Sequence, residues 1–258
     1  MEDEDIIKKQ SLEKMLYFSD IANDFCSFKN EITYNNRFFP KHKIITKLKK
    51  ELKNHQYILE KETILYRSRI YRLPIDINCF IENGYLSGYD AENSLAPKDK
   101  NIIVAGRANP EKISYLYLSQ DIETSIKEIR PIIKNRISVA RIKILKNLKL
   151  FDISNLNKKL KNVPELQSLN YAFSIPNFGD KTDYIPTQYI AELLKNKKFD
   201  GIRFNSSLDN GGINITLFNH ENNCEFIDSK LYLLDDINIH YSDMEDFFKL
   251  FLSIYNKK

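Results

Sequence analysis

The sequence predicts an α+β protein in which helices flank a mixed β-sheet. Two observations predict this class. Segments rich in β-branched and aromatic residues alternate along the chain with segments whose apolar residues recur at helical spacing. The chain has 258 residues, of which 42% are hydrophobic, and this is enough for one sizeable core. We find no internal repeat and no low-complexity linker, so we expect one main domain, residues 61–258, preceded by a helical N-terminal extension, residues 1–60.

The N-terminal extension is predicted from two sets of apolar residues, each of which lies along one side of a helix. The first set is Ile7, Leu12, Met15, Leu16, Ile21 and Phe25, and the second is Ile44, Ile45, Leu48 and Leu52. Several lysines surround the second helix, within residues 41–53. A basic helix of this kind is able to bind phosphate or a partner protein, but more often it is the solvated face of a packed helix.

The main domain is predicted to begin with strands and to end with a helix. Strands are predicted at residues 63–71, 115–118, 136–144 and 148–153, and two more flank the turn-forming sequence SSLDNGG within residues 199–219. Helices are predicted at residues 185–197, with Pro186 in the first turn, and at residues 241–258. Residues 75–110 are expected to be rich in loops.

The segment SYLYLSQDIETSIKEIRP, residues 114–131, combines a strand with a helix. The strand is apolar on both faces, so both should be buried. In the helix, three isoleucines fall on one side and Pro131 ends the pattern. The isoleucines are Ile122, Ile126 and Ile129, and the candidate caps are Asp121 and Ser119. Glu128 lies about 120° around the helix from Ile122, which places a carboxylate at the flank of the apolar stripe.

Several familiar kinds of site are excluded by their motifs. The seven glycines form neither G-x-G-x-x-G nor a Walker A loop, and a G-x-S-x-G elbow is absent. The four histidines have no metal-ligand spacing, and the cysteines, Cys26, Cys79 and Cys224, are too far apart for a zinc motif. We therefore expect no metal and no cofactor, and unlinked thiols in a reducing cytoplasm.

Charge and hydropathy limit the partners. No apolar run approaches the roughly 20 residues that a membrane span needs, and the acidic start, MEDED, is unlike a secretory signal. We therefore expect a cytoplasmic protein with no membrane partner. The net charge of +4 is too small to indicate direct nucleic-acid binding. Arg37 and His42 have the R-x-x-x-x-H spacing of HEPN-type ribonucleases, but Pro40 interrupts the helix that this motif requires.

Polar residues stand on otherwise apolar segments in five blocks. The blocks are LYRSR (65–69), GRANP (106–110), SYLYLSQDIETSIKEIRP (114–131), YIPTQYIAE (184–192) and FDGIRFNSSLDNGGINITLF (199–218). Each polar residue taken alone has a plain structural explanation, such as a surface ion pair or a turn. Their order along residues 63–220 resembles the RES-domain family, which is named for an arginine, a glutamate and a serine. The chain looks most like the longer members, which carry a helical N-terminal extension.

The resemblance implies a set of site residues. The implied catalytic residues are Glu128, Arg67 and Ser206. The implied substrate-binding residues are Arg69, Arg107, Asn109, Tyr117 and Asn214. Arg69 is also an alternative to Arg67 as the working arginine, and Ser207 lies beside the serine. Ala108 stands where many members carry a large side chain, so the packing that such a group provides must come from elsewhere.

The resemblance also implies a fold and an activity. The fold is an ADP-ribosyltransferase-like mixed β core with flanking helices. Members are typically toxins of bacterial toxin–antitoxin pairs, and they cleave NAD at its nicotinamide–ribose bond with phosphate or water as acceptor. The implied partners are therefore NAD as a substrate, inorganic phosphate or water, and an antitoxin protein, and a homo-oligomer stays open.

The residue types suit this chemistry. Cleavage expels neutral nicotinamide and leaves an oxocarbenium-like ribosyl group, so the leaving group needs no general acid. A fixed carboxylate stabilises the developing positive charge. Arginines bind pyrophosphate in bidentate fashion, and a tyrosine offers a flat face to nicotinamide.

Three rival functions stay open. A HEPN-like ribonuclease requires RNA cleavage that depends on Arg37 and His42. A mono-ADP-ribosyltransferase that modifies a macromolecule needs nearly the same fold and site. A non-enzymatic protein would bind nucleic acid or a partner through the basic helix, and its binding to nucleic acid would depend steeply on salt.

Overall fold

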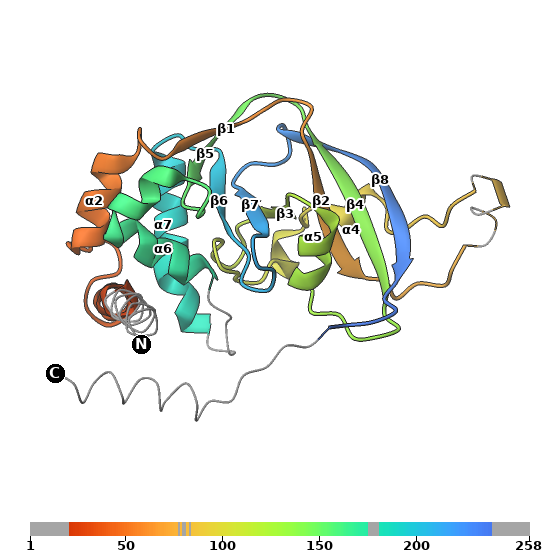
Figure 1. Cartoon of the computed structure of the whole chain (residues 1–258), viewed down its shortest axis with the longest axis horizontal. Coiled ribbons are helices and arrows are strands. Elements are labelled where there is room, and N and C mark those ends of the chain that lie inside the picture. Colours follow the sequence, from red (N-terminus) through yellow and green to blue (C-terminus); the bar gives the residue numbers. More distant parts are fainter. Residues whose placement is uncertain (1–20, 77, 79–80, 83, 175–180, 239–258) are drawn as a thin grey trace, which may run out of the picture.

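The computed structural model describes residues 21–76, 78, 81–82, 84–174 and 181–238 (Figure 1). Within these residues an eight-stranded sheet runs in the order β1-β5-β6-β7-β3-β2-β4-β8. The strands are β1 (Gln56–Leu59), β2 (Ile64–Ile70), β3 (Leu116–Ser119), β4 (Arg136–Ile144), β5 (Leu148–Asp152), β6 (Gly201–Asn205), β7 (Ile213–Leu217) and β8 (Cys224–Leu233). β5 and β6 run parallel, and the other neighbours are antiparallel. The predicted α+β class with a mixed sheet is confirmed.

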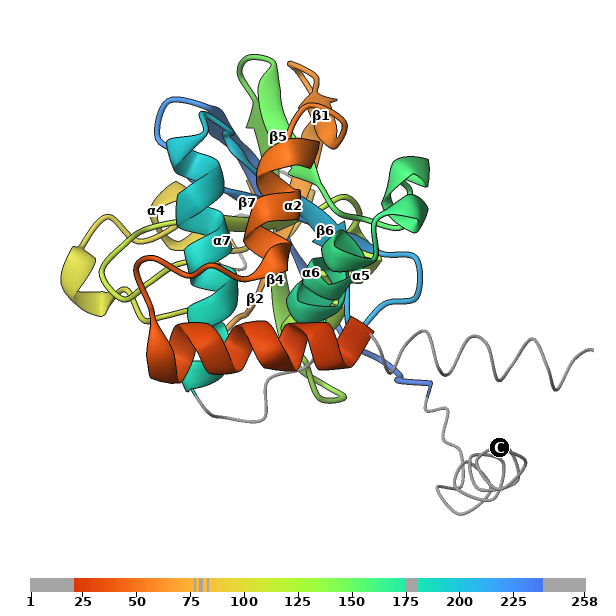
Figure 2. The same ribbon diagram turned by 90° about the vertical axis from the view of Figure 1, so that its left-hand side faces the viewer.

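Helices cover two parts of this sheet. Residues 21–30 are helical and continue into a π-helical turn, Glu31–Asn35. The α-helices that follow are α2 (Lys43–Glu51), α4 (Ala91–Ser94), α5 (Ile122–Glu128), α6 (Pro164–Ser174) and α7 (Ile185–Asn196), and short 3-10 turns lie at Lys100–Ile102, Lys158–Asn162 and Lys181–Tyr184. Figures 1 and 2 show α2, α6 and α7 gathered over the end of the sheet that holds β5 and β6. α5 packs instead on β2 and β3.

Two apolar cores lie on opposite faces of the sheet. Because side chains alternate along a strand, the register of β5 and β6 puts Phe151 and Ile202 on one face, where they join the core under α2, α6 and α7. Leu150 and Leu116 belong to the second core, on the other face. The pairing of Ser119 with Asn214, and of Asn214 with Phe204, extends the first face across β7 to β3.

Most predicted elements of the main domain are confirmed. The predicted strands correspond to β2, β3, β4 and β5, and SSLDNGG joins β6 to β7 in an antiparallel pair. The helix predicted at 185–197 is α7, with Pro186 at its start. In the extension, Ile21 and Phe25 are buried, and so are Ile44, Ile45 and Leu48 of α2.

Three parts of the chain differ from these expectations. The helical prediction for residues 1–60 is wrong at Gln56–Leu59, which is a strand because it pairs with the edge of β5. Neither β8 nor α6 was predicted. The first four residues of the first apolar set and the predicted helix at 241–258 lie outside the described residues, and the domain boundary at residue 60 stays a prediction.

The buried face of α5 also differs from the prediction. The fully buried residues are Thr124 and Ser125, whereas the three isoleucines are half-buried. The buried side of this helix is polar because it packs on polar groups of the sheet. The Ser125 hydroxyl, for example, lies 2.5 Å from the hydroxyl of Ser68 on β2. Asp121 is the cap, since its carboxylate accepts a hydrogen bond from the Thr124 amide at 2.8 Å.

Candidate active site

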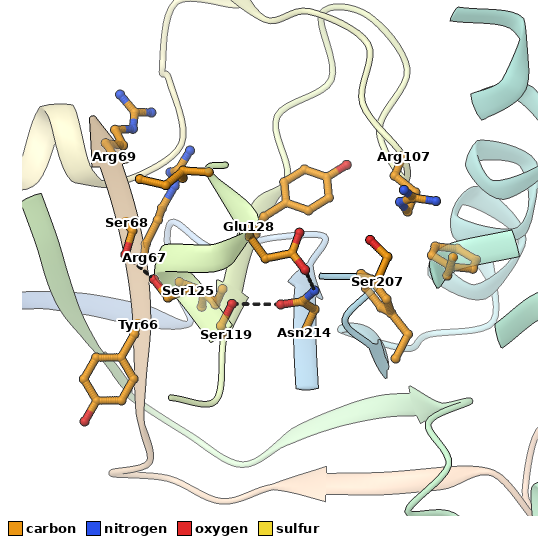
Figure 3. A pocket seen from close by; sticks show the side chains of 15 residues that line it. Tyr66, Arg67, Ser68, Arg69, Arg107, Ser119, Ser125, Glu128, Ser207 and Asn214 are labelled. Carbon is orange, nitrogen blue, oxygen red and sulfur yellow. Dashed lines mark hydrogen bonds between the residues drawn. The ribbon is translucent and has the colours of Figure 1, made fainter. Parts of the chain in front are cut away.

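A cavity of about 390 Å³ opens where β2 and β3 separate. These neighbours share one residue pair, Tyr66 with Ser119, and beyond it the strands are not paired. The cavity is lined by Tyr66, Arg67, Ser68, Arg69, Arg107, Tyr117, Leu118, Ser119, Ser125, Glu128, Ile129, Phe173, Phe204, Ser207 and Asn214. The structure thus brings together six of the residues singled out from the sequence. They are Tyr117 and five that Figure 3 labels, namely Arg67, Arg69, Arg107, Glu128 and Asn214.

Glu128 is held at the wall of the cavity by two hydrogen bonds. Its Oε1 accepts from Ser206 Oγ at 2.6 Å and from Asn214 Nδ2 at 2.7 Å. The Asn214 amide is oriented in turn because its Oδ1 accepts from Ser119 Oγ at 2.8 Å. Both bonds that the described residues give to this carboxylate end on Oε1, so Oε2 stays available to a ligand.

Ser206 supports Glu128 from the turn that joins β6 to β7. Its hydroxyl accepts from the amides of Leu208 and Asp209, both at 3.0 Å, while it donates to Glu128. Its own amide donates to the Gly212 carbonyl and closes the turn. Ser207, not Ser206, lines the cavity. The geometry therefore gives Ser206 a contact with the carboxylate and gives Ser207 a place on the wall.

Two arginines enter the cavity from β2. Arg67 donates from Nη1 to the Ser94 carbonyl at 3.1 Å. Burial and, to a smaller extent, the nearby charge of Arg69 lower the pKa of Arg67 to about 9. Burial lowers the pKa of Arg69 as well. Within the described chain, no carboxylate is among the groups that shift either pKa, so both guanidinium groups favour an anionic ligand.

Arg107 faces Glu128 from a loop that Tyr117 and Asn109 hold in place. Arg107 donates to the Ala172 carbonyl of α6 at 2.8 Å, and burial lowers its pKa although Tyr184 and Glu128 raise it. In Figure 3, Glu128 lies between Arg107 and the arginines of β2. The cavity therefore holds three guanidinium groups and one carboxylate, which suits a ligand that carries several negative charges.

Tyr117 and Asn109 have structural hydrogen bonds. The Tyr117 hydroxyl accepts from the amide of Ala108 at 2.9 Å and donates to Asn109 Oδ1 at 2.8 Å, and burial raises the pKa of Tyr117 to about 12. The Asn109 side-chain amide donates to the carbonyls of Val104, Pro110 and Ile113. We had expected Asn109 to contact the substrate, but it does not line the cavity. Its hydrogen bonds instead stabilise the loop that presents Arg107.

Sequence reasoning missed three hydroxyl groups of the cavity wall. Ser68 and Ser125 contact each other, and Ser119 orients Asn214. All three are buried. The signal for Ser125 was its spacing, because it precedes Glu128 by three residues and therefore shares its side of α5. The signal for Ser119 was its place at the end of an apolar strand.

Other candidate sites find little support in the described chain. It contains no group of three or more His, Cys, Asp or Glu side chains that is able to hold a metal ion. No helix among the residues described is long and apolar enough to cross a membrane. Residues 36–42 are not helical, and His42 instead caps α2, its Nδ1 accepting from the Ile44 amide at 3.3 Å. Arg37 and His42 thus lack the continuous helix of a HEPN motif.

Comparisons with known proteins agree with the sequence blocks. A model of the RES domain matches residues 89–234, which is more than half of the chain. A chain in the crystal structure of the M. tuberculosis MbcT–MbcA toxin–antitoxin complex is similar, with a TM-score of 0.44 and 12% sequence identity over 72% of this chain and 92% of that chain. No curated protein sequence matches. The match includes Glu128 and Ser206 but begins after β2, which carries Arg67 and Arg69. Because the RES-domain model matches more than half of the chain, the chain belongs to the RES-domain family.

Proposed function

We propose that this protein cleaves the nicotinamide–ribose bond of NAD and acts as the toxin of a toxin–antitoxin pair. Membership of the RES-domain family supports the class. The observation that carries the chemistry is Glu128, whose Oε1 is fixed by Ser206 and Asn214 in a cavity that also holds Arg67, Arg69 and Arg107. One oriented carboxylate among three cations fits a substrate with a cationic sugar–base bond and an anionic pyrophosphate.

Glu128 is the catalytic residue in this proposal. As the bond between the ribose carbon and the pyridinium nitrogen breaks, its electron pair leaves with neutral nicotinamide, and positive charge develops on the ribose. The free oxygen of Glu128 stabilises that charge and accepts a hydrogen bond from a ribose hydroxyl. Because Oε1 is already held, the carboxylate needs no reorientation as the charge forms.

The arginines and Tyr117 bind the rest of the substrate. Arg67 and Arg69 share one side of β2 and contact the pyrophosphate, since burial strengthens their attraction for an anion. Tyr117 presents its ring to the nicotinamide, because its hydroxyl is engaged with the 108–109 backbone and the ring is fixed. The acceptor that captures the ribosyl group is water, which loses a proton to give ADP-ribose, or inorganic phosphate, which gives ADP-ribose-1″-phosphate.

The test is Glu128→Gln, which keeps the size of the side chain and removes its charge. Loss of one preorganised electrostatic group costs on the order of 10²–10³ in rate, so nicotinamide release from NAD should nearly vanish while the circular-dichroism spectrum is unchanged. The matched control is Glu123→Gln on the same helix, where the side chain is 75% exposed and salt-bridged to Lys127, and turnover should be kept.

Products distinguish the rival functions. Mass spectrometry of NAD incubated with wild type, with and without phosphate, separates ADP-ribose-1″-phosphate from ADP-ribose. A macromolecule that gains ADP-ribose, with no loss of NAD in its absence, would instead identify a transferase. Wild-type protein freed of any antitoxin that releases no nicotinamide would overturn the proposed function, and equal release by wild type and Glu128→Gln would overturn the role of Glu128.

A further inference from the structure

The turn of residues 206–212 is joined to α5 at two points, one helical turn apart. The first is the contact between Ser206 and Glu128. The second lies at Thr124, four residues before Glu128 and therefore on the same side of the helix. Both attachments start from one short turn, because Ser206 and Asp209 are three residues apart.

Asp209 makes the second attachment. Its Oδ2 lies 2.7 Å from Thr124 Oγ1, and its Oδ1 accepts from Lys127 Nζ at 2.7 Å. Thr124 is completely buried, and the Asp209 side chain is only 15% exposed. The Thr124 hydroxyl also lies 2.7 Å from Asp121 Oδ2, so its single proton serves one of the two carboxylates at a time. Lys127 supplies a positive charge beside Asp209.

Gly212 gives independent evidence that the turn is pressed against the helix. A Cβ atom at this position would lie 2.6 Å from Thr124 Oγ1 and 2.8 Å from Asp209 Oδ2. Such distances are far shorter than normal van der Waals contacts, so only glycine allows this approach. The turn and α5 thus meet through a close backbone contact as well as through hydrogen bonds.

We propose that Asp209 and Thr124 are positioning residues that hold Ser206 against Glu128, an inference that rests on the proposed function. The path is short. The Asp209 amide donates to the same Ser206 hydroxyl that donates to Glu128, so a shift of Asp209 moves Ser206 directly. Neither Asp209 nor Thr124 lines the cavity. Their contribution to turnover therefore passes through the orientation of Glu128.

The experiment compares Thr124→Val, Thr124→Ser and Asp209→Asn with wild type. Valine keeps the shape of threonine but lacks the hydroxyl, whereas serine retains it. Misplacing a reacting group by about 1 Å costs on the order of 10²-fold in rate, so Thr124→Val and Asp209→Asn should lower kcat by roughly tenfold to 10²-fold with little change in KM. Thr124→Ser should keep most of kcat. The control is Asp228→Asn. This variant removes a carboxylate of β8 that pairs with Arg141 of β4 and does not line the cavity, so it should keep kcat.

Coupling to Ser206 separates positioning from general stability. In a Ser206→Ala background, Thr124→Val should lower kcat only slightly further, because the contact that it disturbs is already absent. Additive losses in the double variant, or an unchanged kcat in Thr124→Val, would overturn the inference.

Hydrogen exchange tests the same inference without turnover. The amides of Leu208 and Asp209, which donate to Ser206 Oγ, should exchange faster in Thr124→Val than in wild type, while amides in the middle of β4 keep their protection. Equal exchange in both proteins would overturn the inference even if wild type cleaves NAD. If wild type releases no nicotinamide but Thr124→Val still exchanges faster at these amides, the proposed function would be overturned. The contacts of Asp209 and Thr124 would then still hold the turn against α5.

Discussion

Two halves of one face of the sheet differ in the side chains that they bury. Over β5 and β6, the face carries Phe151, Ile202 and Phe204, which pack under α6 and α7 in a continuous apolar core. Over β3 and β7, the same face carries Ser119 and Asn214, which pack under α5. β5 and β6 run parallel whereas β3 and β7 run antiparallel, but side chains alternate between the two faces in both pairs, so the apolar or polar character of each half comes from its side chains.

This difference separates stability from chemistry. The apolar half removes large side chains from water and contributes most of the hydrophobic free energy on this face. The polar half gains less from burial, and each of its groups needs a partner, which it finds in pairs such as Ser68 with Ser125 and Ser119 with Asn214. We therefore expect changes in the first half to affect unfolding and changes in the second half to affect turnover.

Of the variants considered, Phe28→Ala should have the largest effect, a loss of unfolding free energy. Phe28 lies in the helix of residues 21–30, has no exposed surface and belongs to the core under α2 and α6. Removing a buried phenylalanine ring costs about 3–5 kcal/mol of unfolding free energy, because it forfeits burial and leaves a cavity. Denaturation with urea measures this loss. The protein that remains folded at low temperature should keep its kcat for NAD, and a selective fall in kcat would contradict the separation of the two halves.

Arg67→Ala should have a somewhat smaller effect, and it should appear in substrate binding and not in the free energy of unfolding. A hydrogen bond to a charged group contributes about 1.5–3 kcal/mol, so losing the contact with the pyrophosphate should raise KM by roughly tenfold to 150-fold. The rate on bound NAD should fall less, since Arg67 is not the carboxylate that stabilises the ribosyl cation. Steady-state kinetics with Arg69→Ala as the companion variant checks the assignment. If Arg67→Ala is silent and Arg69→Ala is severely impaired, Arg69 is the working arginine.

The comparison also shows what the sequence was able to predict. Strand and helix patterns were clear where apolar residues recur at a regular spacing, as in β4 and α7, and the five blocks led to Glu128 and the arginines. β8 was missed because its exposed face carries charged residues such as Glu225 and Lys230, which weaken a strand pattern at the edge of a sheet. β1 was hidden in a segment of helical composition, since a strand of four residues depends on its neighbour β5 more than on its own sequence.

Long-range partners limited the prediction of the site. An aspartate followed by Asn-Gly-Gly normally indicates a turn, so nothing local to Asp209 pointed to its contact with Thr124, 85 positions away in sequence. Asn109 was expected at the substrate because it stands in the GRANP block, yet its amide is used by three carbonyls of its own loop. Only the fold shows that Asn109 supports its own loop while Arg107 of the same block lines the cavity.

The smallest expected effect is on the pH dependence of stability, and it comes from His55 in the apolar half. His55 is fully buried next to Phe151, and its Nδ1 accepts from Asn157 Nδ2 at 2.9 Å, an arrangement that suits the neutral ring. Burial lowers the pKa of His55 from its ordinary value of 6.5, although the Asp152 carbonyl opposes this shift. Below pH 6.5 the unfolded chain therefore binds a proton that the folded protein does not, and stability should fall as the pH falls.

The variant His55→Gln tests this expectation through the slope of unfolding free energy against pH between pH 7 and 5. One histidine contributes at most about 1.4 kcal/mol per pH unit, so the variant should show a shallower slope than wild type by no more than this amount, whatever its absolute stability. His42 and His220, whose pKa values burial also lowers, should account for part of the slope that remains. The same slope in wild type and His55→Gln would mean that His55 binds its proton equally well in both states, and the apolar half would then contribute nothing through this residue to the loss of stability in mild acid.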